Sequence, residues 1–170
     1  NVYKMYDLVR NIPCEHFVIL ANTDTYGGGG IYNSYTLTTA HHPSFRPVVV
    51  HEFGHSFGGL GDEYFYEQPD HTENFYALGY EPWEQNITTL VDFDSKWKDM
   101  VGKGTPIPTE PTDKRKEKYT IGAYEGGGYM TKGMYRPAVI CRMRDNVATQ
   151  FCPVCQRAIE RIILYNTTQE

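Results

Sequence analysis

The sequence predicts a single domain of mixed α and β structure. A chain of 170 residues is long enough to bury one substantial core, and it contains no internal repeat. Residues 16–21 and 31–39 have the apolar run and the alternation expected of strands, whereas residues 43–57 and 151–165 carry the signals of helices. We therefore expect residues 1–170 to form one α+β domain.

The N-terminal part is predicted to contain the end of a helix followed by two strands. Residues 2–11 fit the helix end, and residues 17–20 form an apolar run typical of a buried strand. Residues 27–30 are four glycines, for which we predict a flexible hairpin, because the P-loop pattern G-x-x-x-x-G-K-[ST] does not follow them. Alternating apolar residues then predict a strand over residues 31–39.

The chemistry of the chain centres on the predicted helix over residues 43–57. Ser44 is suited to be its N-cap and Pro47 lies within its first turn, while a run of glycines ends it. His51 and His55 are four residues apart and so lie on one face of this helix. Both imidazoles can therefore point at a single metal ion.

Glu52 completes the H-E-x-x-H arrangement of zinc peptidases. In that arrangement the two histidines bind Zn²⁺ and the glutamate acts as the general base on a water molecule. The sequence therefore assigns the catalytic base to Glu52 and a Zn²⁺ cofactor to His51 and His55. The alternative is a buried amphipathic helix whose histidines only make hydrogen bonds.

A catalytic zinc site needs a third protein ligand if one position is to stay open for water and substrate. The acidic pair Asp62 and Glu63 follows the glycine turn, and adjacent residues of an extended segment point opposite ways. We predict Asp62 as this ligand, with Glu63 and then His71 as alternatives. The other carboxylate of the pair, together with Tyr64, is expected to orient the ligands.

The segment HEFGHSFGGLGDEYFY resembles the signature of the IgA peptidase family, secreted metallopeptidases best known from gut bacteria. That family is similar to the metzincins, whose motif H-E-x-x-H-x-x-G-x-x-H ends in a third histidine. Gly58 lies at the metzincin glycine, whereas Gly61 occupies the position of the third histidine and Asp62 follows it. The chain thus departs from the metzincin pattern at the third ligand.

The resemblance extends from about residue 17 to residue 163 and implies a metzincin-like catalytic domain. Such a domain is an α/β sandwich with a twisted mixed sheet, an active-site helix, a glycine turn, a Met-turn and a C-terminal helix. Residues 135–144 are similar to the family's Met-turn, with Met143 as the methionine beneath the metal. The resemblance also implies that residues 31–39 are an edge strand that pairs with extended substrate, and that the first strands of the fold are missing from this chain.

Composition excludes several other classes of protein. The net charge of -5, with no basic stripe beyond the cluster at residues 114–116, excludes a nucleic-acid-binding surface. No apolar run approaches the length of a membrane span. The chain does not begin with Met, so we expect a mature or excised fragment of a protein that is secreted, periplasmic or displayed on a bacterial surface.

Four cysteines are present, of which Cys152 and Cys155 form a C-x-x-C motif at the start of the last helix. A zinc knuckle would need a second C-x-x-C or a pair of histidines at suitable spacing, and neither is present. We therefore predict a disulfide from Cys141 to Cys152 or Cys155, which fits an oxidising, exported setting.

These features predict a zinc endopeptidase that acts on a protein or peptide, with immunoglobulin or another host protein as the substrate that the resemblance suggests. A tyrosine or arginine is expected to help stabilise the oxyanion, with Tyr135, Arg136 and Arg144 as candidates. Two alternatives stay open: a zinc hydrolase of a non-protein amide or ester, and a non-catalytic surface-binding module with a structural zinc.

Overall fold

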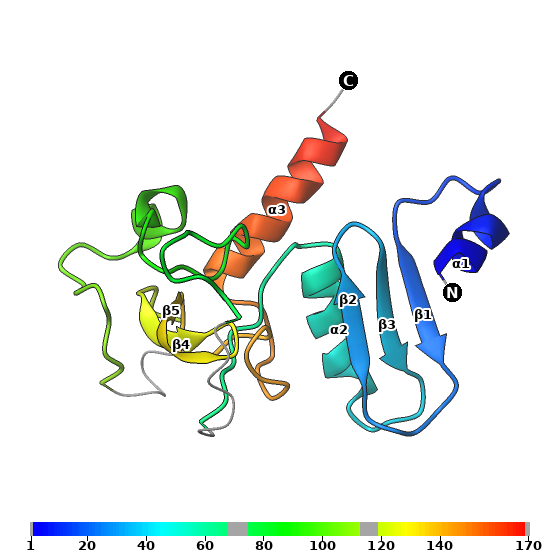
Figure 1. The fold of residues 1–170 in the computed structure, drawn as a ribbon, viewed down its shortest axis with the longest axis horizontal. Helices are drawn as coiled ribbons and strands as arrows, with labels where there is room; N and C mark the ends of the chain where they lie inside the picture. Colours follow the sequence, from blue (N-terminus) through cyan, green and yellow to red (C-terminus); the bar gives the residue numbers. More distant parts are fainter. Residues whose placement is uncertain (1, 68–74, 113–118, 169–170) are drawn as a thin grey trace.

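The computed structural model describes residues 2–67, 75–112 and 119–168. Two sheets and three α-helices make up an α+β fold, as predicted from the sequence. Figure 1 shows the three-stranded sheet and its helix in the N-terminal half, and the two-stranded hairpin and the last helix in the C-terminal half. His71 and the basic cluster at residues 114–116 lie outside the described residues.

The N-terminal sheet consists of β1 (Phe17–Ala21), β2 (Gly28–Ile31) and β3 (Tyr35–Thr39), in the order β1-β3-β2. Strand β1 runs parallel to β3, and β2 runs antiparallel to it. The strand predicted over residues 16–21 is confirmed, but its predicted burial is wrong, because Val18 and Leu20 are more than half exposed. The prediction of one edge strand over residues 31–39 is wrong: β3 is paired on both sides, and β2 is the edge strand beside the active-site helix.

Three of the four glycines predicted to form a flexible hairpin, Gly28 to Gly30, instead lie in β2. Strand β2 packs directly on the following helix, and side chains would not fit between them. A Cβ added at Gly28 would lie 2.7 Å from a methyl of Val48, and one at Gly30 would lie 2.3 Å from the backbone oxygen of Glu52. Gly28 and Gly30 are therefore required by close packing of a strand on a helix, which a sequence pattern for turns does not detect.

Helix α2 (Phe45–Ser56) confirms the helix predicted over residues 43–57 and packs against β2 and β3. Ser44 is its N-cap, although its side chain makes no capping hydrogen bond. At the other end, the backbone N–H of Leu60 donates to the carbonyl of Gly54, and Gly59 adopts a φ of 58°. The glycine-rich turn thus reverses the chain within one helical turn and brings the next segment back alongside α2.

The C-terminal half contains the hairpin of β4 (Tyr124–Gly127) and β5 (Met130–Arg136), two short 3₁₀ helices, η1 (Phe93–Ser95) and η2 (Lys98–Met100), and α3 (Pro153–Thr167). Its core is built around Trp97, which is fully buried and donates its indole N–H to the carbonyl of Gly122 at 2.6 Å. At the far N-terminus, α1 (Val2–Val9) packs on β1 through an edge-on contact between Tyr6 and Phe17. No helix within the described ranges has the length and apolar character needed to cross a bilayer.

Candidate metal centre

Helix α2 brings the half-buried side chains of His51, Glu52 and His55 together, where they form a group of candidate metal ligands. The Nε2 atoms of the two histidines are 3.1 Å apart, and the rings meet edge to face. This proximity follows from the four-residue spacing, which places one imidazole a turn above the other. The structure therefore confirms the prediction that His51 and His55 lie on one face of the helix.

Each imidazole is oriented by a backbone carbonyl at its other nitrogen. The Nδ1–H of His51 donates to the carbonyl of Arg142 at 3.0 Å, and the Nδ1–H of His55 donates to the carbonyl of Leu60 at 2.6 Å. Since a carbonyl can only accept, Nδ1 must carry a proton in both rings. The lone pairs at Nε2 are thereby directed toward the same point, as in histidines that bind metals.

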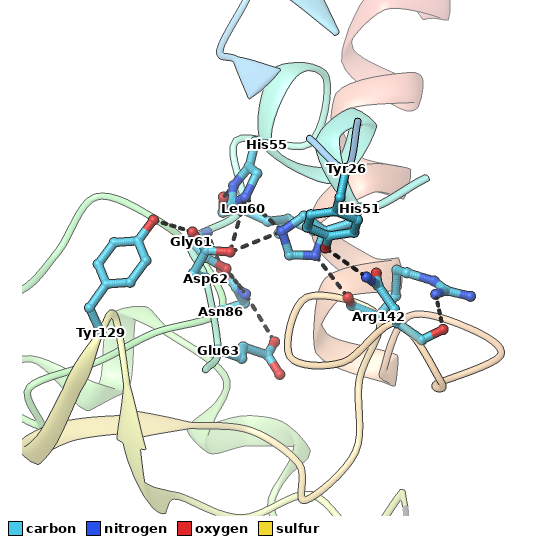
Figure 2. Close-up of polar contacts among 11 residues, drawn as sticks. Tyr26, His51, His55, Leu60, Gly61, Asp62, Glu63, Asn86, Tyr129 and Arg142 are labelled. Atoms are coloured by element: carbon cyan, nitrogen blue, oxygen red, sulfur yellow. Dashed lines mark hydrogen bonds and ion pairs between the residues drawn. The ribbon is translucent and has the colours of Figure 1, made fainter. Parts of the chain in front are cut away.

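Asp62 supplies the third atom at this point. Its Oδ1 lies 3.0 Å from Nε2 of His51 and 3.1 Å from Nε2 of His55. Its other oxygen accepts a hydrogen bond from the hydroxyl of Tyr129, and Figure 2 shows Asp62 between this tyrosine and the two histidines. Burial by itself would raise the pKa of Asp62, but the hydrogen bonds and charges of the histidines hold that pKa well below its usual range.

Glu63 points away from the histidines, as expected for the neighbour of Asp62 in an extended segment (Figure 2). Asn86 holds this segment in place: its Oδ1 accepts from the N–H of Gly61 at 2.7 Å, and its Nδ2 donates to the carbonyl of Gly61 and to Glu63 Oε1, both at 2.9 Å. Asn86 is fully buried, yet nothing in its sequence context indicated this role. It is a positioning residue that only the fold reveals.

The arrangement of His51, His55 and Asp62 fits a bound divalent cation. Ligands at about 2.0–2.2 Å from a tetrahedral metal lie about 3.3–3.6 Å from one another, and the observed spacings of 3.0–3.1 Å are within about half an ångström of this range. Because Nδ1 of each histidine is already protonated, each Nε2 carries either a further proton, which it donates to Asp62, or a lone pair. In the second state, two lone pairs and an anionic oxygen face one another. Without a cation or additional protons, these three acceptors would repel.

Glu52 lies beside this group and lines a cleft of about 540 Å³ together with His51, Tyr64 and Arg144. Burial raises the pKa of the Glu52 carboxyl, the positive charges of His51 and His55 lower it in part, and the charge of Asp62 adds to the rise. A carboxylate with a raised pKa in a cleft is a stronger base than an exposed one, which is what proton abstraction near neutral pH needs.

The predicted Met-turn methionine is buried beneath α2, whereas the oxyanion candidates lie partly in the cleft and partly away from it. Met143 is fully buried, and a Cβ added at Gly54 would come within 2.4 Å of its sulfur, so Gly54 lets this methionine pack directly on α2. Of the three oxyanion candidates, Arg144 lines the cleft. Arg136 is instead buried, with Nη1 donating to the carbonyls of Glu125 and Gly126.

The predicted disulfide from Cys141 is absent. All four cysteines lie in the described part of the chain and all are free. Sγ of Cys155 lies 3.6 Å from Sγ of both Cys141 and Cys152, far beyond the bond length of about 2.05 Å. The prediction was wrong because a third sulfur and Glu63 share the same pocket, which spacing in the sequence did not show.

Two histidines and a carboxylate beside a basic glutamate define a candidate divalent-metal centre of the kind that hydrolases use. The family model of the IgA peptidase M64 family matches residues 3–120 and 113–163, and the chain belongs to this family. The resemblance inferred from the motif is thereby confirmed, and the chain is a peptidase, which implies a protein or peptide substrate. No curated protein matches the chain.

Proposed function

We propose that this chain is a zinc-dependent endopeptidase in which His51, His55 and Asp62 bind the metal and Glu52 is the general base. The observation that supports it best is the convergence of two imidazole Nε2 atoms and one carboxylate oxygen beside a cleft lined by Glu52. When bound there, zinc polarises the scissile carbonyl and makes water a better nucleophile at neutral pH.

Glu52 accepts a proton as water attacks the scissile carbonyl and passes that proton to the amine of the leaving group. Two features support this role: its carboxylate faces the same cleft as His51, and burial raises its pKa, which makes it a stronger base than an exposed carboxylate. Arg144 lines the cleft as well and is the best placed of the three candidates to donate a hydrogen bond to the developing oxyanion.

The edge of the sheet supplies a surface for an extended peptide. Strand β2 is hydrogen-bonded to β3 on one side only, and Gly28 at its start lines the cleft with Glu52. A peptide that pairs with the free edge of β2 would therefore run past the base. Pairing of this kind uses backbone groups and suits a peptidase that binds several residues of its substrate.

Neither alternative drawn from the sequence is favoured by the findings. Membership of a peptidase family argues against a hydrolase of non-protein amides or esters. A purely structural zinc would occupy a closed site with four protein ligands, whereas His51, His55 and Asp62 supply three and adjoin an open cleft. Export from a bacterium and cleavage of immunoglobulin remain predictions.

The test of the proposed function is the variant Glu52→Gln, which keeps the size and shape of the side chain but cannot accept the proton. We expect kcat/KM for a fluorogenic peptide to fall by about 10²- to 10⁴-fold, with the zinc content unchanged. Glu160→Gln, at an exposed position of α3, is the matched control. Full hydrolysis by zinc-loaded Glu52→Gln would exclude Glu52 as the base.

A further inference from the structure

A second group of ligand atoms lies on the other side of the segment that carries Asp62. Glu63, Cys141, Cys152 and Cys155 are all fully buried, and their ligand atoms all lie within 4.8 Å of one another. None of these side chains has a part in the mechanism proposed above. The group joins three separate segments of the chain.

The distances in this group match those between ligands of a common metal ion. Sγ of Cys155 lies 3.6 Å from Sγ of Cys141, 3.6 Å from Sγ of Cys152 and 3.1 Å from Oε1 of Glu63. Around a tetrahedral zinc, sulfurs at about 2.3 Å from the metal lie about 3.8 Å apart, and a sulfur and a carboxylate oxygen about 3.6 Å apart. The observed spacings are within about half an ångström of these values.

Glu63 lacks the partners that a buried carboxylate needs. Asn86 donates to its Oε1, but Oε2 has no hydrogen-bond partner. Arg136 is close enough for its charge to act on Glu63, yet its Nη1 donates to the carbonyls of Glu125 and Gly126. Oε1 accepts from Asn86 and from the Cys155 thiol, so the cost of burial falls on Oε2, and a bound cation would remove that cost.

The backbone around the cysteines also suits thiolate ligands. Cys152 is the N-cap of α3, Pro153 follows as the first helical residue, and Cys155 lies in the first turn. Negative charge on sulfur is stabilised at a helix N-terminus. In addition, the backbone N–H of Cys152 donates to Sγ of Cys141 at 3.2 Å.

We propose that Glu63, Cys141, Cys152 and Cys155 form a second metal site, which binds a thiophilic divalent cation such as zinc with four protein ligands. A closed site of this composition is structural, because no position remains for substrate. The C-x-x-C motif alone did not predict it, since the other two ligands come from Cys141, outside any recognisable spacing, and from Glu63, far away in the sequence.

A metal ion at this second site would also hold Asp62, the proposed third ligand of the first site, in place. Glu63 follows Asp62 directly, and its backbone N–H donates to the carbonyl of Met143 at 2.9 Å. A cation between Glu63 and the cysteines would therefore fix Asp62 and the Met143 segment to the start of α3. The proposal does not depend on the catalytic role of the first site, since it rests on different side chains.

Metal content and cobalt spectroscopy of the purified 170-residue chain test this proposal. We expect two zinc ions in the wild-type chain and one in each of His51→Ala and Cys141→Ser. After cobalt substitution, a thiolate-to-cobalt charge-transfer band should be present in the wild type and in His51→Ala and absent in Cys141→Ser. The exposed Cys14 provides the matched control, and Cys14→Ser should keep both ions and the band.

Thiol counting separates the metal site from a disulfide. Unfolding in the presence of a chelator and without reductant should release four reactive thiols, whereas a disulfide within the group would leave two. Two thiols, or a single zinc with no thiolate band in the wild type, would overturn the proposal. These measurements on the wild type decide the proposal even if Cys141→Ser does not fold. Glu63→Gln, which keeps the size of the side chain, is a second variant of the same site.

Discussion

At the scale of a single residue, Tyr129 reaches the candidate metal centre from a strained backbone conformation. It follows Gly128 in the two-residue loop between β4 and β5, and both have positive φ, 56° and 67°. Glycine adopts this conformation freely, but a tyrosine there costs about 1–2 kcal/mol. The strained position directs the Tyr129 hydroxyl to Asp62, where it donates a hydrogen bond.

The variant Tyr129→Phe removes this hydrogen bond and keeps the ring. We expect the affinity for the catalytic metal to fall by about 10- to 100-fold, the usual effect of losing a partner of a metal ligand. Competition with a chelator measures this affinity. Tyr76→Phe is the matched control. Tyr76 lines one pocket with Tyr129 and Asp62, but its hydroxyl donates to Glu84, so loss of this hydroxyl should leave metal binding unchanged. Equal effects of the two variants would contradict the assigned role of Tyr129.

At the scale of elements, the packing of β2 on α2 sets the position of the sheet edge relative to Glu52, the proposed base. Gly30 lies against the backbone of Glu52 and the Cβ of His55, while the side of Gly29 faces open space. The two neighbouring glycines therefore offer a comparison in which the same methyl group is added with and without a clash.

We expect Gly30→Ala to destabilise the chain by about 1–3 kcal/mol, the usual cost of overpacking, and to lower kcat/KM because β2 must move away from α2. Gly29→Ala should be close to neutral or slightly stabilising, since alanine reduces the freedom of the unfolded chain. Urea denaturation and peptide hydrolysis measure the two effects. If both variants behaved alike, close packing of β2 on α2 would not be the reason for the glycine at position 30.

The sequence predicted the elements whose signals are local. The helix predicted over residues 43–57 is α2, and His51 and His55 were correctly placed on one face of it by their spacing of four residues. Strand β2 was missed because Gly28 and Gly30 are required by a packing contact with α2, which no local pattern records. The group around Glu63 was missed for the same reason, since three separate segments form it.

At the scale of the whole molecule, the candidate catalytic site is assembled from both halves of the chain. The histidines come from α2, but the carbonyl that orients His51 belongs to Arg142, and the hydroxyl that holds Asp62 comes from the loop before β5. Across the cleft, the amide of Asn146 donates to the hydroxyl of Tyr26 at 3.0 Å. A metal at this site therefore links segments that are distant in the sequence, and its binding should stabilise the entire fold.

Removing the metal should consequently lower the melting temperature. For each ion, a free metal concentration a thousandfold above Kd contributes about 4 kcal/mol, and a chain of this length shifts by about 2–4 °C per kcal/mol, so we expect a fall of about 8–16 °C for each ion that chelation removes. Glu52→Gln should respond as the wild type does, because the base is not needed to hold the metal. His51→Ala should melt lower from the start and respond less, since only the cysteine site could still lose an ion. Differential scanning calorimetry with and without chelator makes this comparison, and an equal response in His51→Ala and the wild type would show that the histidines of α2 do not hold the stabilising ion.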